Sequence, residues 1–348
     1  MIYNLPVLTS NFVQGKKVFL RLDLDVPKSD QGIVDTTRID AGFPTLEFLL
    51  KEKSEIIIGS HIGRPHGVDQ NLSLKNIGRA LSARLESLTT FEEIEFGGFQ
   101  AFKLGERVTL LENLRFYDGE EKNDSDFAKK LAGFAEIYVN EAFAVSHRDH
   151  ASITGVAKLL PHFAGFRLQT EVQELSKVLE SPVRPLCVVI GGAKIETKLP
   201  LVTKMVSFAD SVLVGGEIAV QIKNEQLRMK NDEKLIVADL KPEGTDITEN
   251  SVQIFKTEIE KAKTIVWNGP MGKISEEINK SLLSEEGTEK IARIISESSA
   301  HTIVGGGDTI GFLNKHGLLQ KFSFVSTGGG AMLAFLSGEN LPGLEALL

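Results

Sequence analysis

The stretch PLCVVIGGAKIETK, residues 185–198, shows the pattern that decides the fold. An apolar run of strand type ends abruptly in two glycines, and a segment with helical spacing follows. A single glycine pair after a strand is most often only a tight turn. The second half of the chain nevertheless repeats this ending in four further runs: SVLV-GGE (211–217), TIVW-NGPMG (264–272), HTIV-GGGDT (301–309) and FSFV-STGGGA (322–331). The repetition predicts a surface that binds phosphate through backbone N–H groups.

The first half of the chain carries strand-type runs that end in polar residues and not in glycines. These runs are KKVFL (16–20), EIII (55–58), RVTLL (107–111) and EIYV (136–139). Segments with helical spacing lie between them, such as the one that holds Ile39, Phe43, Leu46 and Leu50. The alternation predicts βα units and parallel sheets, in which ligands bind just beyond the carboxyl ends of the strands.

The length of 348 residues exceeds the size at which one hydrophobic core usually stops growing, so two domains are expected. A connecting helix is predicted from apolar residues at helical spacing followed by two prolines: Leu168, Val172, Leu175, Leu179, then Pro182 and Pro185. The fold class is therefore α/β, with two doubly wound, Rossmann-like parallel-sheet domains joined by a helix and a deep cleft between them. The expected boundaries are 1–166 for the first domain, 167–181 for the helix and 182–325 for the second domain.

The composition argues against several classes of protein. A net charge of −8 opposes a general nucleic-acid binder, which needs a basic surface. No apolar run approaches the roughly 20 residues that span a bilayer, and the first residues lack the features of a secretory signal. The single Cys187 has no partner for a disulfide and is expected to be a buried packing residue. A cytoplasmic protein without nucleic-acid or membrane partners is expected.

Cationic and protonatable side chains gather at or near the strand ends of the first half: Arg21, Arg38, His61, Arg64, Arg115, His147, Arg148 and His150. The planar fork of an arginine matches carboxylate and phosphate, so several arginines from different strands suit a small molecule that carries both groups. For any single arginine, a surface ion pair with Asp23, Asp25 or Glu141 is the alternative. His147 and His150 do not indicate a metal site, because no third ligand has matching spacing and Arg148 would repel a cation.

In the second half, Lys194 and Lys198 stand four residues apart where a helix begins beside a glycine turn. Asp308 follows a run of three glycines, where it suits Mg²⁺ held by one carboxylate and by substrate phosphates. A helix N-cap is the alternative for this aspartate. An acid-anion site in one half and a polyphosphate site with Mg²⁺ in the other imply phosphoryl transfer. The sequence motifs of P-loop enzymes and of protein kinases are absent.

The chain resembles the phosphoglycerate kinase family over nearly its whole length. The matching motifs stand in the order RLDLDVP (21–27), DTTRIDAGFPT (35–45), GSHIGRP (59–65), LLENLRF (110–116), VNEAFAVSHRDHAS (139–152), GGAKIETK (191–198), WNGPMG (267–272), VGGGDT (304–309) and VSTGGGA (325–331). The resemblance implies reversible, Mg²⁺-dependent transfer from 1,3-bisphosphoglycerate to ADP in glycolysis, giving 3-phosphoglycerate and ATP. It also implies a monomer whose C-terminal segment, about 326–348, packs back towards the first domain.

The resemblance also implies a role for individual residues. The phosphoglycerate contacts would be Asp23, Asp25, Arg38, His61, Arg64, Arg115 and Arg148. The nucleotide site would include Lys194, Lys198, Gly215, Gly216, Asn268, Glu276, Gly305, Gly306, Gly307, Asp308 and Thr309. Arg38, Lys194 and Lys198 would act in catalysis, and Asp308 would bind Mg²⁺.

Several positions depart from the family pattern. Asp25 stands where the family usually has Asn, and Glu141 and Ala144 alter the usual DAFG stretch. Ser275 stands at the position of a glutamate expected to hold the nucleotide ribose, unless Glu276 takes that role. The segment between Gly216 and Asp246 looks shortened. The alternative is an inactive relic of the same fold that binds phosphoglycerate or a nucleotide. A nicotinamide-dependent dehydrogenase would need a G-x-G-x-x-G turn that opens a helix, and the sequence has none placed that way.

Overall fold

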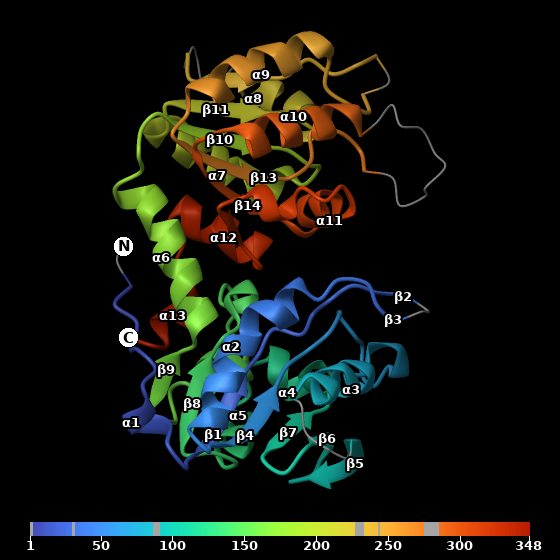
Figure 1. The fold of residues 1–348 in the computed structure, drawn as a ribbon, viewed down its shortest axis with the longest axis vertical. Helices are drawn as coiled ribbons and strands as arrows, with labels where there is room; N and C mark the ends of the chain where they lie inside the picture. Colours follow the sequence, from blue (N-terminus) through green and yellow to red (C-terminus); the bar gives the residue numbers. More distant parts are fainter. Residues whose placement is uncertain (1–2, 30–31, 86–90, 227–232, 243, 275–284) are drawn as a thin grey trace. The chain divides into compact units, whose positions relative to one another are not determined.

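The structure is a computed structural model that describes residues 3–29, 32–85, 91–226, 233–242, 244–274 and 285–348. The chain divides into two compact units, and each is described by itself. Unit 1 consists of Met1–Gln173 together with Asn340–Leu348, and unit 2 consists of Glu174–Glu339. Figure 1 shows the elements of unit 1 in blue to green and those of unit 2 from green to red, apart from the C-terminal residues.

Unit 1 is built on a seven-stranded sheet in the order β5-β6-β7-β4-β1-β8-β9. Its strands are β1 (Lys17–Arg21), β4 (Glu55–Gly59), β5 (Phe91–Phe96), β6 (Phe99–Leu104), β7 (Val108–Leu111), β8 (Ile137–Asn140) and β9 (His162–Ala164). Strands β7, β4, β1, β8 and β9 are parallel, which confirms the predicted parallel sheet. Their buried apolar runs fit strands covered on both faces. A separate pair, β2 (Lys28–Ser29) and β3 (Gly32–Ile33), is antiparallel.

The edge of this sheet was not predicted, because β5 and β6 form an antiparallel hairpin that also pairs with β7. The turn of the hairpin is Gly97 and Gly98, both with positive φ (58° and 77°), as a two-residue hairpin turn requires. Strand β5 carries three glutamates and all of its residues are exposed or half-buried, as expected for the outermost strand of the sheet. The sheet of unit 1 is therefore mixed and not purely parallel.

Most helices of unit 1 lie between strands in the chain, as expected for βα units, whereas α1 precedes β1 and α13 lies at the C-terminal end. They are α1 (Ser10–Val13), α2 (Thr37–Lys51), α3 (Lys75–Arg84), α4 (Asp118–Glu121), α5 (Ser125–Ala132) and α13 (Pro342–Glu345), with 3-10 turns η1 (Gln70–Leu72), η2 (Leu114–Phe116) and η3 (Phe143–Val145) and the π-helix η4 (Ala151–Gly155). The predicted helical spacing from Ile39 to Leu50 corresponds to α2. Ile39, Leu46 and Leu49 of this helix are buried against the sheet residues of the core.

Unit 2 contains a six-stranded sheet in the order β12-β11-β10-β13-β14-β15, and every pairing in it is parallel. Its strands are β10 (Leu186–Ile190), β11 (Ser211–Val214), β12 (Leu235–Val237), β13 (Thr264–Asn268), β14 (His301–Gly305) and β15 (Phe324–Val325). The helices are α7 (Ile195–Phe208), α8 (Ile218–Gln226), α9 (Glu249–Lys261), α10 (Glu286–Glu297), α11 (Gly307–Lys315) and α12 (Gly329–Ser337), with the 3-10 turn η5 (Leu319–Lys321). The five predicted glycine-ended runs are all strands of this sheet, and only β12 was missed.

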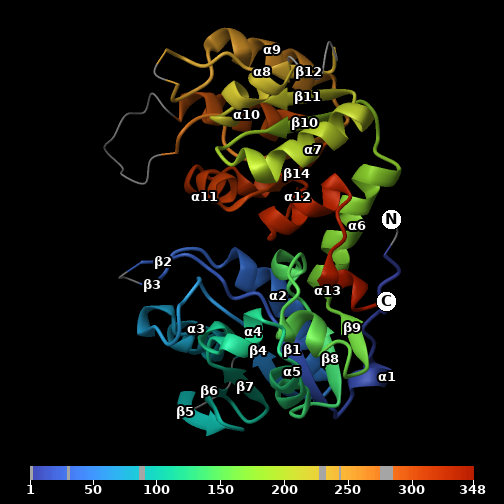
Figure 2. The same ribbon diagram turned by 180° about the vertical axis from the view of Figure 1, so that it is seen from behind.

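The predicted connecting helix is α6 (Phe166–Glu180), and the division between the units falls inside it. The C-terminal segment was predicted to return to the first domain from residue 326. In the structure α12 packs on α7 of unit 2, and only Asn340–Leu348 joins unit 1, where α13 packs on η4. Figure 1 and Figure 2 both show the red helix α13 among the blue and green elements of unit 1.

Candidate active site

The central strands of unit 1 end at one edge of the sheet, where the predicted anion-binding residues follow. Arg21 at the end of β1 lies in register with Gly59 of β4 on one side and with Asn140 of β8 on the other. Because these strands are parallel and adjacent, the loops that follow them converge. The residues brought to this edge include Asp23, His61 and Arg115.

Arg21 is a buried positioning residue, with 1% of its surface exposed. Its Nε donates to the Oγ of Ser152 (2.8 Å), its Nη1 donates to the Leu22 carbonyl (2.7 Å), and its Nη2 lies 3.0 Å from the Nδ1 of His61. Three of its donors therefore serve contacts within the protein, which fits a positioning role for Arg21.

The same contact fixes the tautomer of His61. An arginine can only donate, so the Nδ1 of His61 must accept and the ring proton sits on Nε2. Burial and the nearby Arg21 hold the pKa of His61 well below its usual value, which keeps the ring neutral at pH 7. His61 thus presents one N–H donor, and its Nε2 lies 3.8 Å from the Oδ2 of Asp25.

Arg38, in the first turn of α2, lies between two carboxylates. Its Nε is 3.5 Å from the Oδ2 of Asp23, and its Nη1 is 3.7 Å from the Oδ2 of Asp25. The Nη1 also donates to the Asp25 carbonyl at 2.7 Å. Burial raises the pKa of Asp23, although Arg38 opposes this shift. The ion pairs considered as an alternative are therefore present, and they hold Arg38 at the sheet edge.

The backbone of Gly63 joins Asp25 to Arg115. Its N–H donates to the Oδ1 of Asp25 at 2.9 Å, and its carbonyl accepts from the Nη1 of Arg115 at 2.6 Å. Gly63 has a φ of +65°, and a Cβ there would lie 2.7 Å from the side chain of Leu72. The loop that carries the exposed Arg64 is thereby held through the N–H and the carbonyl of one residue.

The cations of this cluster repel one another. Burial is the main cause that lowers the pKa of Arg115 to about 10, and Arg148 lowers it further. The pKa values of His147 and His150 fall to about 4 and about 3, again through burial and nearby arginines. His147 and His150 are therefore neutral at pH 7, and the arginines supply the positive charge that would attract an anionic ligand.

Several buried polar atoms of the cluster have no hydrogen-bond partner among the described residues: Asp23 Oδ2, Arg115 Nε, His147 Nδ1 and Arg148 Nε. A buried polar group without a partner costs about 1–3 kcal/mol, so proteins rarely leave several together. Two of these atoms lie against an ion-pair partner, since Arg38 is 3.5 Å from the Asp23 oxygen and Glu121 is 3.2 Å from the Arg115 nitrogen.

A buried network below the cluster was not predicted from the sequence. Glu120, fully buried, accepts from the backbone N–H of Ser152 at 2.9 Å and from its hydroxyl at 2.6 Å. The same hydroxyl accepts from the Nε of Arg21. Burial raises the pKa of Glu120, while the charge of Arg21 lowers it. Nothing in the sequence distinguishes Glu120 from the neighbouring Glu121.

Glu141 has a structural role at the start of the connecting helix. Its carboxylate accepts from the Thr45 hydroxyl (2.6 Å) and from the backbone N–H of Arg167 in α6 (3.0 Å). It therefore satisfies part of the N-terminus of this helix. Gly165 packs so closely that a Cβ there would lie 1.9 Å from the Oε2 of Glu141. Burial raises the pKa of Glu141 to about 8, while Thr45 and the backbone donors oppose the shift.

In unit 2 the glycine turns pack directly against one another. A Cβ on Gly191 would lie 2.1 Å from the Pro270 carbonyl, one on Gly216 would lie 2.5 Å from the Gly192 nitrogen, and one on Gly269 would lie 2.2 Å from the Gly191 carbonyl. These glycines are thus required by backbone contacts as well as by any ligand. Gly215 and Gly305 pack against the sulfur atoms of Met271 and Met332.

Lys198 lies among these turns and is 8% exposed. Its Nζ donates to the Oδ1 of Asn268 at 2.8 Å. Because a lysine only donates, the amide oxygen of Asn268 must face it, and the buried Nδ2 on the other side has no hydrogen-bond partner among the described residues. Burial lowers the pKa of Lys198 to about 8, and the carboxylate of Asp308 partly opposes this.

Asp308 is not a helix N-cap, because α11 has Gly306 (φ +98°) at that position. Asp308 is exposed in the first turn, and a Cβ added to Gly307 beside it would meet no other described atom within 4 Å. Thr309 is fully buried, and its hydroxyl accepts from the backbone N–H of Gly269 at 3.0 Å. Asp308 therefore remains open to a ligand, whereas the Thr309 hydroxyl holds two turns together.

Lys194 is the exposed N-cap residue of α7, with φ −89° and ψ 93°. It precedes the helix that contains Lys198, so the predicted pair divides into one exposed and one buried lysine. Ser275 and Glu276, considered for the nucleotide ribose, lie outside the described residues.

Comparison with known proteins identifies the family. The phosphoglycerate kinase family model matches residues 8–235 and 220–339. The chain belongs to the phosphoglycerate kinase family. The phosphoglycerate kinase of Leptospira biflexa is 37% identical to it over 395 positions, which cover 99% of this chain and 98% of the relative. That of Nostoc punctiforme is 35% identical, with 99% and 98% covered.

Solved phosphoglycerate kinases also share the fold. The enzyme from Coxiella burnetii superposes with a TM-score of 0.79 at 32% identity, and 96% of each chain is covered. The enzyme from Pyrococcus horikoshii gives the same TM-score at 28% identity with the same coverage. The comparisons give no support to an inactive relic.

The relatives carry segments that this phosphoglycerate kinase family member lacks, because 395 aligned positions exceed its 348 residues. The two stretches matched by the family model overlap at 220–235, inside the segment that looked shortened. None of the helices in the described part of the chain is long and apolar enough to cross a membrane.

The family acts on a nucleotide together with Mg²⁺. In the described ranges no three His, Cys, Asp or Glu side chains lie together as metal ligands. A single carboxylate is nevertheless compatible with Mg²⁺, which commonly binds one or two carboxylates together with phosphates and water.

Proposed function

We propose that this chain is an active phosphoglycerate kinase that transfers a phosphoryl group reversibly between 1,3-bisphosphoglycerate and ADP. The observation that carries the proposal is the group of buried polar atoms without a hydrogen-bond partner around Arg115 and Arg148 in unit 1. A buried lysine and an unpartnered amide in unit 2 supply a second site of the kind that phosphates need.

The phosphorylated acid would bind to unit 1 through Asp23, Asp25, Arg38, His61, Arg64, Arg115 and Arg148. Arginines give paired donors to carboxylate and phosphate oxygens. His61 contributes a single neutral donor, since its tautomer is fixed by Arg21. The two aspartates can only accept, so they select groups that donate, such as a hydroxyl.

The nucleotide would bind to unit 2 through Lys194, Lys198, Gly215, Gly216, Asn268, Gly305, Gly306, Gly307, Asp308 and Thr309, with Glu276 as a further candidate. Lys198 and the Asn268 Nδ2 face phosphate oxygens in this proposal. Mg²⁺ would be held by Asp308 and by phosphate oxygens, and the cation would neutralise developing charge. The exposure of Asp308 and its proximity to Lys198 fit this role.

Arg38, Lys194 and Lys198 would stabilise the phosphoryl group during transfer, because positive charge placed at the transferring group lowers the barrier. A general base is not needed, since the acceptor in the ATP-consuming direction is a carboxylate that is already ionised. Transfer requires the two substrates to meet, so we propose that the two units close on each other when both are bound. A monomer in the cytoplasm, without nucleic-acid or membrane partners, completes the proposal.

A coupled assay with 3-phosphoglycerate, ATP and Mg²⁺ tests the function. Turnover that requires all three components is expected. A folded protein that binds 3-phosphoglycerate and ATP in calorimetry but gives no turnover would support the inactive alternative. A folded protein that binds neither would overturn the assignment of both sites.

A further inference from the structure

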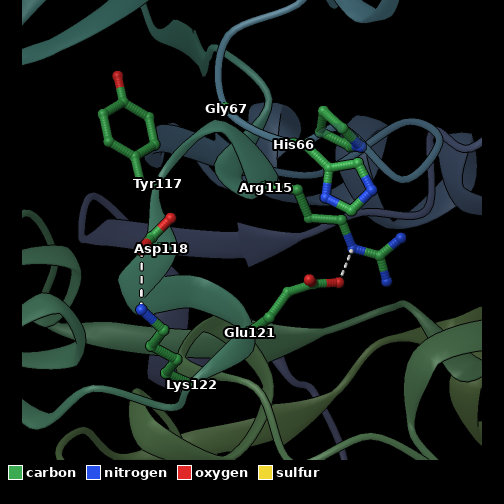
Figure 3. A pocket seen from close by; sticks show the side chains of 8 residues that line it. His66, Gly67, Arg115, Tyr117, Asp118, Glu121 and Lys122 are labelled. Atoms are coloured by element: carbon green, nitrogen blue, oxygen red, sulfur yellow. Dashed lines mark hydrogen bonds and ion pairs between the residues drawn. The ribbon is translucent and has the colours of Figure 1, made fainter.

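A cavity of about 240 Å³ opens beside the anion site of unit 1. One wall is the turn at residues 65–67, and the other is formed by Arg115 and by residues of α4. Figure 3 shows the guanidinium of Arg115 and the carboxylate of Glu121 pointing toward one another in this cavity. Asp118 and Lys122 form a separate pair in the same wall, 2.8 Å apart.

The N–H groups of Arg115 face two partners, the Gly63 carbonyl and the Glu121 carboxylate. One Nη1–H is used by the Gly63 carbonyl. The Nε faces the Oε1 of Glu121 at 3.2 Å, as an ion pair whose geometry is not that of a hydrogen bond. The Nη2 has no hydrogen bond to another described residue, so it is available to a ligand.

The two partners of this ion pair differ in exposure. The side chain of Arg115 is 4% exposed, whereas that of Glu121 is 51% exposed. Glu121 is also the carboxylate that most strongly raises the pKa of Arg115, ahead of Asp25. Lys122 does not neutralise Glu121, because it is engaged by Asp118. The carboxylate of Glu121 therefore partly neutralises the buried Arg115, which is proposed to bind the substrate anion.

We infer that Glu121 limits the affinity of the anion site, because its ion pair with Arg115 weakens the hold of that arginine on the phosphorylated acid. The inference rests on the proposed function. A negative charge beside an anion site opposes anion binding, and the opposition falls with distance and with solvent screening. Glu121 pairs with the Nε of Arg115 and leaves the Nη2 open, so it weakens binding without blocking the site.

Glu121→Gln keeps the size and the acceptor oxygen but removes the charge. The KM for 3-phosphoglycerate and its Kd in calorimetry should both fall by about 3- to 10-fold. The KM for ATP and kcat should stay within about two-fold, because the nucleotide site lies on the other unit. The gain in affinity should shrink as salt rises from about 0.05 M to about 0.5 M, since Glu121 is half exposed.

Asp118→Asn is the matched control. It makes the same chemical change in the same cavity wall, but its carboxylate pairs with Lys122 and not with Arg115. Its KM for 3-phosphoglycerate should stay within about two-fold of the wild type. Equal gains in both variants would mean that general surface charge sets the affinity, and this would overturn the role given to Glu121.

Thermal unfolding checks that each variant is folded, and Glu121→Ala serves as a second variant with the same expected direction. Unchanged or weaker binding of 3-phosphoglycerate in both Glu121 variants would refute the inference. A wild type that binds no 3-phosphoglycerate would refute the proposed function instead, so the two failures are distinguishable.

Discussion

The Nζ of Lys198 lies 2.8 Å from the Oδ1 of Asn268, inside the glycine turns of unit 2. Burial lowers the pKa of this lysine to about 8, so it loses its proton as pH rises through that value. We expect kcat/KM for ATP to fall above pH 8, by up to about ten-fold per pH unit. A bound phosphate should keep the lysine charged to a higher pH. The decline in kcat should therefore begin at a higher pH than the decline in kcat/KM. Steady-state kinetics from pH 6 to 10 measure both profiles, and a flat kcat/KM for ATP to pH 10 would remove Lys198 from phosphate binding.

Lys194→Ala should reduce kcat by about 10²- to 10³-fold while binding of each substrate changes little, because a charge aimed at the transferring group matters most in the transition state. Lys204→Ala, at an exposed position farther along the same helix, is the control and should keep near-normal kcat. Kinetics of the two variants give the comparison. Near-normal kcat in Lys194→Ala would exclude the lysine from the mechanism.

Asp25→Asn should lower the KM for 3-phosphoglycerate by about 3- to 10-fold and change kcat little. Asp25 lies 3.7 Å from Arg38 and 3.8 Å from the ring of His61. Its negative charge therefore competes with the substrate for two groups that are proposed to bind it. An amide can still accept the N–H of Gly63. Steady-state kinetics of both proteins with 3-phosphoglycerate as the varied substrate measure the change. A higher KM in the variant would identify Asp25 as an adapted ligand.

Binding of both substrates should produce a more compact protein than either substrate alone, because the two proposed sites lie on different units. Small-angle X-ray scattering of the apo, binary and ternary states measures this change. The same radius of gyration in all three states would argue against closure.

Gly165→Ala should lower the free energy of unfolding by about 1–3 kcal/mol, because the added Cβ would meet the buried carboxylate of Glu141. Gly311→Ala makes the same change inside α11, where no described atom lies within 4 Å of the new Cβ. That variant should be more stable than the wild type by about 0.4–1 kcal/mol. Denaturant unfolding of both proteins measures the difference, and equal stability would show that Glu141 can move aside at little cost.

Much of the fold follows from local pattern. Runs such as CVVI and SVLV are apolar at nearly every position because their strands are covered on both faces, and this signal is readable without knowledge of the partners. The edge hairpin was missed although the Gly97–Gly98 pair between two strand-type runs is a hairpin signal.

The roles of the individual site residues could not be predicted from local sequence pattern. Arg21 and Arg115 both follow a strand run, yet one holds His61 and Ser152 and the other keeps donors for a ligand. The difference depends on which side chains lie below the sheet edge, and Ser152 is 131 residues from Arg21 in the chain. Long-range contacts of this kind leave no local signal.

The glycine turns of unit 2 restrict how this protein can change over evolutionary time. Where Gly191, Gly216 and Gly269 meet backbone to backbone, no side chain of any kind can be introduced without moving a neighbouring turn. Substitution at these three positions is therefore restricted, whereas the segments that connect the strands can still vary in sequence and length. A library that seeks new nucleotide preferences should vary those segments and leave the turns untouched.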